Sequence, residues 1–295
     1  MSQNGSISLG GRSAAARHTR QRLGFVALTL MAIMTVVPIV GVVAYIAAQG
    51  ASAISLEFLT GLPRGGMREG GILPAIVGTL YLTIGTAVFS VPLGIAAAIY
   101  LAEYSADTPT TRAIRIAIIN LAGIPSVVYG LFGLGLFVLF LQLGTSILAA
   151  SLTLSIMTLP VIISTAEEAL RAVPQAFRTV SISLGATRWQ TIRRIVLKEA
   201  LPGILTGVIL GLERAAGETA PILFTGAAFF LPRLPGSPFD ATMALPYHLF
   251  VISTQVPEMP LRLQYGTALV LLAFVLSMNL VATVIRSRAR ARRQW

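Results

Sequence analysis

Two side chains of opposite charge stand four residues apart in a stretch that is otherwise nearly uncharged. Between Leu201 and Leu231 the charged residues are Arg214, Glu218 and Glu213. A spacing of four residues places Arg214 and Glu218 on one face of a helix, where they can form an ion pair. A guanidinium that lines a cavity also offers an oxyanion several donors in a planar fork. The residues alone therefore indicate an ion or anion route, or an ion pair that only holds helices together.

Arg214 lies deep within its apolar stretch, where a charged side chain is costly. It lies twelve residues after Pro202, which at a rise of about 1.5 Å per residue is about 18 Å along a helix. An arginine near the middle of a bilayer costs roughly 2.5–3.5 kcal/mol, so it should be paired or face water. Glu213 points about 100 degrees away from the face of the pair. We expect Glu213 to meet another helix, a lipid headgroup or a partner subunit.

The composition identifies the class of protein that carries these charges. Of the 295 residues 55% are hydrophobic and 11% are charged, which excludes a water-soluble enzyme and a disordered or collagen-like chain. The absence of cysteine excludes disulfides, iron–sulfur clusters and thiolate metal sites. Asp240, Tyr247 and His248 are too isolated to suggest a metal site. We therefore expect a polytopic membrane protein with no metal and no cofactor.

Long uncharged stretches predict an all-α fold with six transmembrane helices, because a helix needs roughly 20 apolar residues to cross a bilayer. The expected domain covers residues 23–285, between basic tails at 1–22 and 286–295, and its spans are about 25–48, 76–101, 117–141, 146–166, 201–230 and 263–285, with a loop at 167–200. Pro and Gly interrupt several spans, among them Pro125 and Gly217 with Pro221. Such breaks are tolerated where a helix lines a cavity or packs on protein. Six prolines between residues 231 and 262 suggest a stiff outer loop.

The distribution of basic residues predicts the orientation. Seventeen of the 22 Lys and Arg residues fall in the two tails and in the loops 103–115 and 167–199, which lie on one side of a six-span chain. Positive charge is retained on the cytoplasmic side of a membrane. We therefore expect a protein of the inner cell membrane with both termini in the cytoplasm. A basic tail of this kind is typical of an anchor at anionic membrane lipid. We therefore expect lipid contact and no nucleic-acid binding.

The loop at 167–200 predicts two short helices joined by a turn. Pro174 suits the start of the first helix, Gly185 the turn, and Thr187 the cap of a second helix. Trp189 and Ile192 share one face of that second helix. The result is a helical bracket whose apolar face can meet a partner, or an amphipathic helix that lies on lipid headgroups.

The bracket resembles the cytoplasmic loop of permease subunits in binding-protein-dependent ABC importers. Gly185 is followed after nine residues by Ile195-Val196-Leu197, as in the loop whose short coupling helix docks onto the ATPase subunit. The resemblance implies a type I importer permease in which Leu184, Gly185, Ala186, Trp189 and Ile192 contact the ATPase. The chain itself has one lysine, Lys198, and no phosphate-binding GxxxxGK[ST] loop. We therefore expect a transport subunit that is not an enzyme, with ATP hydrolysed by another chain.

The most specific resemblance is to the PstA-type permease of the phosphate-specific importer. It is carried by Gly217-Glu218-Thr219-Ala220-Pro221, by Gly71 to Leu80 and by Ile124 to Gly130. It implies import of inorganic phosphate, with Arg214, Glu218 and Thr219 in the translocation path. The implied partners are a second permease subunit, two copies of an ATPase subunit and an extracytoplasmic phosphate-binding protein.

Three alternatives remain open from the residues. A permease for another oxyanion would use the same arginine. An ion-coupled secondary transporter would use intramembrane carboxylates, although it has no need of a docking bracket. An assembly factor without a transport role would leave Arg214 hard to rationalise.

Overall fold

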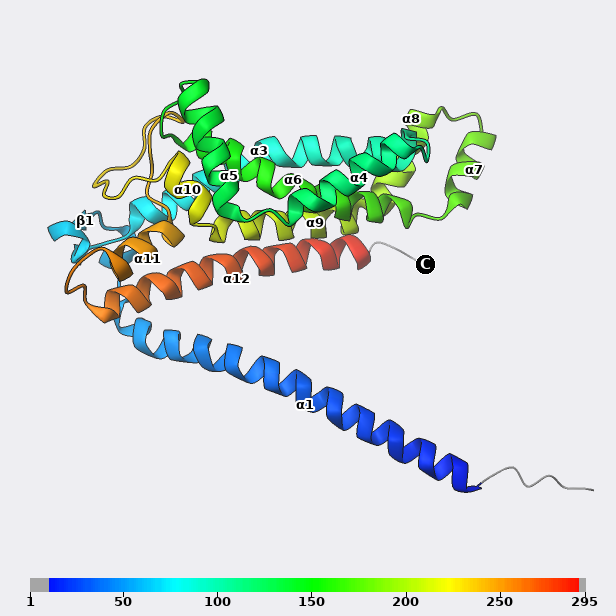
Figure 1. Cartoon of the computed structure of the whole chain (residues 1–295), viewed down its shortest axis with the longest axis horizontal. Helices are drawn as coiled ribbons and strands as arrows, with labels where there is room; N and C mark the ends of the chain where they lie inside the picture. Colours follow the sequence, from blue (N-terminus) through cyan, green and yellow to red (C-terminus); the bar gives the residue numbers. More distant parts are fainter. Residues whose placement is uncertain (1–10, 292–295) are drawn as a thin grey trace, which may run out of the picture. The chain divides into compact units, whose positions relative to one another are not determined.

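The structure is a computed structural model that describes residues 11–291, and the chain divides into two compact units. The first unit, Met1–Gln49, holds one long helix, α1, which spans Gly11–Gly50 and contains Pro38 (Figure 1). Most side chains from residue 21 to residue 49 are exposed and apolar. A membrane supplies the apolar surroundings that such a helix requires.

The second unit, Gly50–Trp295, contains the remaining elements. A short segment precedes the bundle, with η1 (Ala51–Ala53), α2 (Leu56–Thr60), β1 (Pro63–Arg64), η2 (Gly65–Met67) and β2 (Glu69–Gly70). The bundle follows with α3 (Leu73–Ile99), η3 (Tyr100–Tyr104), α4 (Pro109–Ala122), α5 (Ser126–Gly133), η4 (Leu134–Phe140), α6 (Ile147–Arg171), α7 (Gln175–Ser183), α8 (Arg188–Thr191), η5 (Ile192–Val196), α9 (Leu197–Gly217), α10 (Ala220–Thr225), α11 (Leu245–Thr254) and α12 (Leu261–Ala291). The strands β1 and β2 form one antiparallel hairpin, in which Arg64 pairs with Glu69.

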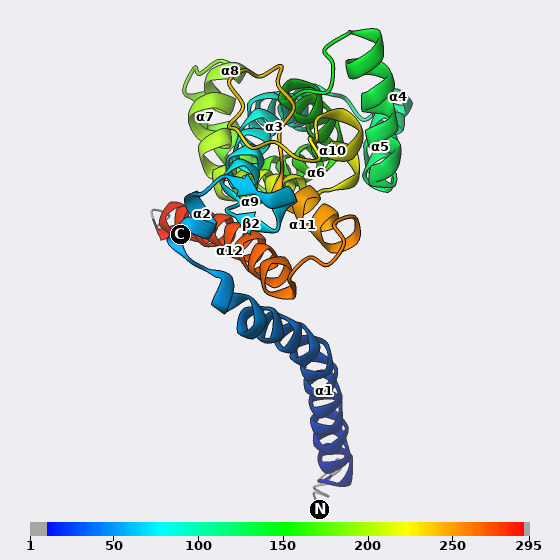
Figure 2. The same ribbon diagram turned by 90° about the vertical axis from the view of Figure 1, so that its left-hand side faces the viewer.

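Helix α6 is the centre of the bundle and packs along both α3 and α9. Small residues allow the close approach, because Gly94 on α3 faces Ile162 and Gly211 on α9 faces the same side chain. Helix α12 runs beside α9 (Figures 1 and 2). The core between these helices includes Leu154 and Met157 of α6, which are almost completely buried.

Several buried hydroxyl side chains of α3 satisfy their hydrogen bonds within their own helix. Thr79, Thr83, Thr86 and Ser90 on α3 each donate to the carbonyl four residues earlier, at 2.7–2.8 Å. This bonding allows hydroxyl groups to be buried where no water is present. Ser155 adds a link between helices, since its hydroxyl donates to the Thr86 carbonyl at 3.1 Å.

The helix count agrees with the six expected spans. Five helical segments are long and apolar enough to cross a membrane, Gln21–Ala53, Leu73–Tyr104, Ile147–Arg171, Arg188–Gly217 and Leu261–Ile285. The pair Pro109–Ala122 and Ser126–Phe140 makes a sixth if it is taken as one broken span. The fold is therefore helical apart from the small hairpin, as the sequence predicts.

Two expected spans differ from the structure. The span at 117–141 is not one straight helix, because the chain bends by 100° between α4 and α5. Pro125, which precedes α5, has no N–H to donate and disfavours helical backbone in the residue before it. The span expected at 201–230 begins earlier, at Arg188, and ends earlier, at Gly217. Both breaks fall where Pro and Gly interrupt the sequence.

The outer segment between residues 231 and 262 is more ordered than a loop. Its centre is α11, which has Pro246 in its first turn. Leu245, Val251 and Ile252 of this helix are buried in the main core. The stiff loop expected from the prolines is therefore only part of this segment.

Candidate functional site

The candidate transport site lies at a break between two helices. Helix α9 ends at Gly217, Glu218 has extended backbone (φ −75°, ψ 138°), and α10 begins at Ala220. Pro221 stands in the first turn of α10, where its missing N–H costs nothing, whereas inside a continuous helix it would clash with the preceding turn. Gly217 is a weak helix former, which favours the same end point. The sequence thus places an irregular backbone at the depth of the charged pair.

Arg214 and Glu218 meet across this break. The Arg214 Nε lies 3.4 Å from the Glu218 Oε1, and the side chains are 36% and 18% exposed. The ion pair expected from the spacing is therefore present, although Glu218 caps α9 and does not belong to its last turn. The arginine also stands in the last turn of α9, where the negative end of the helix dipole stabilises a cation. A partly exposed guanidinium in this position keeps N–H groups free for an anion.

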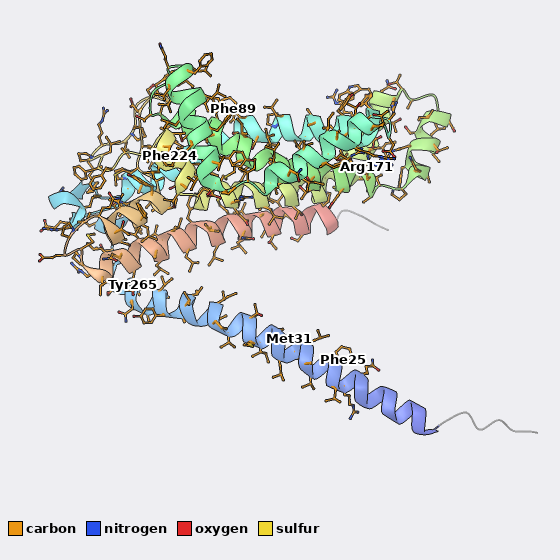
Figure 3. The ribbon with its side chains drawn as sticks, in the orientation of Figure 1. Phe25, Met31, Phe89, Arg171, Phe224 and Tyr265 are labelled. Atoms are coloured by element: carbon orange, nitrogen blue, oxygen red, sulfur yellow. The ribbon has the colours of Figure 1, made fainter. Side chains whose placement is uncertain are left out.

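Helix α5 packs directly against the break and holds it in place. A Cβ on Gly130 would lie 2.8 Å from the ring of Phe224 and 3.0 Å from both the Ala220 carbonyl and the Pro221 Cα. Phe224 is labelled in Figure 3 on α10. Two segments on which the family resemblance rests, 124–130 and 217–221, are therefore neighbours in space.

The third of these segments, residues 71–80, has a different position. It forms the start of α3, where Thr79 accepts a hydrogen bond from the Leu245 amide at 2.8 Å. A Cβ on Gly78 would collide with the main chain of Met243. This segment therefore supports α11 and its outer neighbours and does not contribute to the pair at Arg214.

Glu213 points away from the pair, as the helix geometry predicts. Its side chain interacts with Asn279 of α12. One of its carboxylate oxygens is buried and has no hydrogen-bond partner among the described residues. Glu213 thus belongs to the contact between α9 and α12, which is the first of the environments expected for it.

The bracket at 167–200 has the predicted arrangement of two short helices joined by a turn. Pro174 precedes α7, Gly185 has a positive φ of 85° in the turn, and Thr187 caps α8. The cap is reciprocal, because the Gln190 amide donates to the Thr187 hydroxyl at 3.3 Å and the Thr187 amide donates to the Gln190 side chain at 2.9 Å. Helix α8 continues through η5 into α9. The second arm of the bracket is thus the beginning of the span that carries Arg214.

The residues expected to contact an ATPase fall into two groups. Leu184 is 83% exposed and Trp189 is 53% exposed, so both present apolar surface at the turn, beside Gly185 and Ala186. Ile192 is only 1% exposed and packs inside the bundle. This burial does not support its expected role as a docking residue, which stays a prediction. Periodicity placed Ile192 on the face of Trp189, but Trp189 is exposed whereas Ile192, at the start of the π-helical turn Ile192–Val196, is buried.

Sequence interpretation missed two buried carboxylates at the end of the bundle that carries the bracket. Glu103 pairs with Arg178 at 2.6 Å, and Glu167 pairs with Arg115 at 2.8 Å and with Arg171 at 2.9 Å. The signal that could have identified them is their position, because each directly follows a long uncharged stretch and precedes a loop with basic residues. Buried carboxylates need such partners.

The other ionisable groups give no sign of a metal site. Among residues 11–291, no group of three or more His, Cys, Asp or Glu side chains is placed to hold a metal ion. Asp240 instead accepts hydrogen bonds from the amides of Gly236 and Ser237 and shapes a turn. His248 is buried in α11, and burial lowers its pKa to about 4.

The comparison with protein families identifies the class. Residues 90–293 match the family described as binding-protein-dependent transport system inner membrane component, and the chain belongs to this family. It is therefore a multi-pass inner-membrane permease subunit and not an enzyme. The importers of this family work with an ATPase and a substrate-binding protein.

Curated relatives place the chain within the family. It is 37% identical to the phosphate transport system permease protein PstA 1 of Mycobacterium tuberculosis over 226 residues. This match covers 76% of this chain and 72% of the relative. It is 35% identical to PstA of Mycobacterium leprae, with 84% and 82% covered. It is 34% identical to the probable ABC transporter permease protein YqgI of Bacillus subtilis, with 81% and 85% covered. The resemblance to PstA-type permeases is confirmed.

Solved structures confirm the fold alone. A chain of the MetNI methionine ABC transporter in an inward-facing conformation is similar with a TM-score of 0.60 and 17% identity, and the match covers 74% of this chain and 95% of that one. A chain of a bacterial ABC transporter that imports alginate matches with a TM-score of 0.61 and 14% identity, over 94% and 99% of the two chains. The type I importer permease fold expected from the sequence is therefore present.

Proposed function

We propose that this chain is a permease subunit of an ATP-driven importer of inorganic phosphate and forms half of the translocation pathway. The observation that carries the proposal is the pair Arg214–Glu218 at the break between α9 and α10, in a chain whose relatives are phosphate transport permeases. An arginine offers phosphate up to five N–H donors. A helix break beside the arginine is tolerated in a membrane where the irregular backbone lines a pathway.

In the proposed mechanism Arg214 attracts the anion and Glu218 limits how long it stays. When phosphate enters, its oxygens replace the Glu218 carboxylate, which lies at the long distance of 3.4 Å. When phosphate leaves, the Glu218 carboxylate pairs with the Arg214 guanidinium again. Transport requires binding that is strong enough for entry and weak enough for release. Thr219 adds a hydroxyl next to the pair.

The proposed partners follow from the surfaces of the chain. A second permease subunit completes the pathway, and two copies of an ATPase subunit dock on the brackets of the two permeases. On this chain Leu184 and Trp189, beside Gly185 and Ala186, form the docking turn, and their exposure supports this role. An extracytoplasmic phosphate-binding protein delivers the substrate on the opposite side.

The proposed orientation places both termini and the bracket in the cytoplasm, because the basic residues gather in those segments. The chain contains no cysteine, so a single cysteine can report its own side of the membrane. We expect Leu184→Cys to resist an impermeant thiol reagent in intact cells and Phe239→Cys, in the outer segment, to react. Labelling of Leu184→Cys in intact cells would reverse the orientation.

The function is tested with the whole complex in proteoliposomes. The chain is co-expressed with a second permease, the ATPase and the binding protein, and uptake is measured with phosphate and with sulfate. We expect phosphate-loaded binding protein to stimulate ATP hydrolysis and uptake of phosphate. Stimulation by sulfate in place of phosphate would support a permease for another oxyanion, and uptake without ATP would support a secondary transporter.

A further inference from the structure

The cytoplasmic end of α3 is a π-helical turn, η3, that exposes its backbone to side chains from neighbouring helices. The Leu101 carbonyl in this turn accepts hydrogen bonds from Arg115 of α4 at 3.0 Å and from Arg171 of α6 at 3.2 Å. The Ser105 hydroxyl donates to the same carbonyl at 2.7 Å. A π-helical turn disturbs the regular ladder of a helix, which leaves a carbonyl of this kind available.

The carboxylate of Glu103, in the same turn, binds the bracket. Its Oε1 accepts from the Arg178 Nη2 at 2.6 Å, and both carboxylate oxygens accept from the Nε at 3.2 Å. The two side chains are only 7% and 14% exposed. The Glu103 carbonyl also accepts a hydrogen bond from Arg188 of α8, whose guanidinium lies over the Tyr104 ring. Both arms of the bracket, α7 and α8, therefore reach the end of α3.

Arg178 also holds the end of α6. Its Nη2 donates to the Leu170 carbonyl at 2.9 Å, and its Nη1 donates to the Val173 carbonyl at 2.6 Å. The Leu170 carbonyl belongs to the last turn of α6, and Val173 lies two residues beyond the end of this helix at Arg171. One guanidinium on α7 thus joins three elements: its own helix, the end of α6 and the end of α3.

Besides these polar contacts, Phe177 of α7 packs against a small apolar core at the ends of α3, α6 and α9. A polar cavity of about 790 Å³ separates its arms from the end of α3, and Glu103, Arg178 and Arg188 lie on the wall of this cavity. The two arms are tied to each other by the hydroxyls of Ser181 and Thr191, 2.8 Å apart. A force on the turn at Gly185 therefore reaches α9 through the continuous chain, but it reaches α3 and α6 through side chains.

We propose that the Glu103–Arg178 ion pair is a positioning contact that transmits movement of the bracket to α3 and α6, so that these two helices move together with α9. The inference rests on the proposed function, because it assumes that an ATPase moves the bracket. Without the pair, the bracket would act on α3 and α6 only through Arg188, through Phe177 and through the packing of α9 against these helices. ATP would then be hydrolysed without a matching movement of phosphate.

The first test measures coupling in proteoliposomes that contain the full complex. Arg178→Gln removes the charge and most donors, and we expect the phosphate transported per ATP hydrolysed to fall at least about threefold, within the range of mutations in coupling elements. Arg178→Lys keeps the charge but loses the planar fork, so its loss is expected to be smaller. An unchanged ratio in Arg178→Gln, at normal complex assembly, overturns the proposal.

The matched control is a second cytoplasmic ion pair. Arg112 and Asp107 lie 2.8 Å apart, but their side chains are 66% and 67% exposed. Surface pairs of this kind contribute little. We expect Arg112→Gln to retain the wild-type ratio, and an equal loss in this variant would show that any lost cytoplasmic charge uncouples the complex.

The second test does not depend on the substrate. Spin labels on Thr179→Cys in α7 and Tyr100→Cys in η3 report the distance between bracket and α3, because the chain has no other cysteine. In the protein with Arg178 intact, we expect a narrow distribution of distances between the two labels, which stays narrow when ATP is trapped. In Arg178→Gln we expect a broad distribution. Equal widths in the two proteins overturn the inference. If the wild-type complex moves no phosphate, the proposed function fails, and these distances still decide whether the pair holds the bracket.

Discussion

The Glu218 carboxylate lies 3.4 Å from the Arg214 guanidinium, although a helix end separates the two residues. Arg214 is fixed in the last turn of α9, whereas Glu218 has extended backbone between α9 and α10. The carboxylate can therefore move away by rotation at Glu218 without unwinding α9. A pair within one continuous helix would lack this freedom. On the proposed function, the break gives Arg214 a partner that an entering anion can replace.

Removal of the arginine tests the route most directly. Arg214→Gln keeps a side chain of similar size but loses the charge. A hydrogen bond to a charged group contributes roughly 1.5–3 kcal/mol, so we expect phosphate uptake to fall about tenfold to a hundredfold. Uptake of radioactive phosphate by cells measures the effect, and copurification of the ATPase shows whether the complex assembles. Wild-type uptake by an assembled Arg214→Gln complex would reduce the pair to a structural contact.

The contact of Gly130 with α10 predicts a second effect at the same site. In Gly130→Ala the new methyl group meets the Ala220 carbonyl and Pro221 Cα, which are main-chain atoms that cannot move aside. Overpacking of this kind costs about 1–3 kcal/mol and should displace α10 from α5. The thermal unfolding temperature of the purified protein is therefore expected to fall, together with uptake.

Gly135 supplies the control for this substitution. It lies in η4, and no atom lies within 4 Å of the position that its Cβ would take. Because alanine is the better helix former, by about 1 kcal/mol at most, Gly135→Ala should be neutral or slightly stabilising. A loss of stability as large as that of Gly130→Ala would show that the contact with α10 is not the cause.

Local signals in the sequence predict the elements well. Gly185 and Thr187 mark the turn and the cap of the bracket, and both appear where they are expected, because these conformations depend on neighbouring residues alone. The same is true of the break at Gly217 and Pro221. The breaks were visible as Pro and Gly interruptions, but the extent of the spans at 117–141 and 201–230 was not.

Contacts between distant residues could not be predicted in this way. Glu103 and Arg178 are 75 positions apart, and their pairing depends on how α3, α6 and α7 pack. Ile192 illustrates the same limit, since periodicity shows that a face is apolar but does not show whether the face meets the protein's own core or a partner. The π-helical turn that begins at Ile192 has no simple signature in the sequence.

The two environments of Leu184 and Ile192 predict two different kinds of loss. Leu184→Asp changes an exposed side chain, so we expect normal stability but weaker copurification of the ATPase. Ile192→Ala removes buried atoms and should destabilise the chain by about 2–5 kcal/mol. Thermal unfolding and copurification, measured on both variants, separate the two effects. Full retention of the ATPase by Leu184→Asp would contradict the docking role of the turn.

The buried imidazole of His248 predicts how stability depends on pH. Burial lowers its pKa from 6.5 to about 4, so the folded protein keeps it neutral while the unfolded chain takes up a proton at higher pH. Its contribution to stability is complete above pH 6.5 and declines as the pH falls toward about 4. The loss is expected to approach about 3 kcal/mol, because each unit of pKa difference corresponds to about 1.4 kcal/mol. His248→Leu cannot be protonated, so its unfolding temperature in detergent should fall less than that of the wild type over this range. Parallel curves for the two proteins would show that other groups set the dependence on pH.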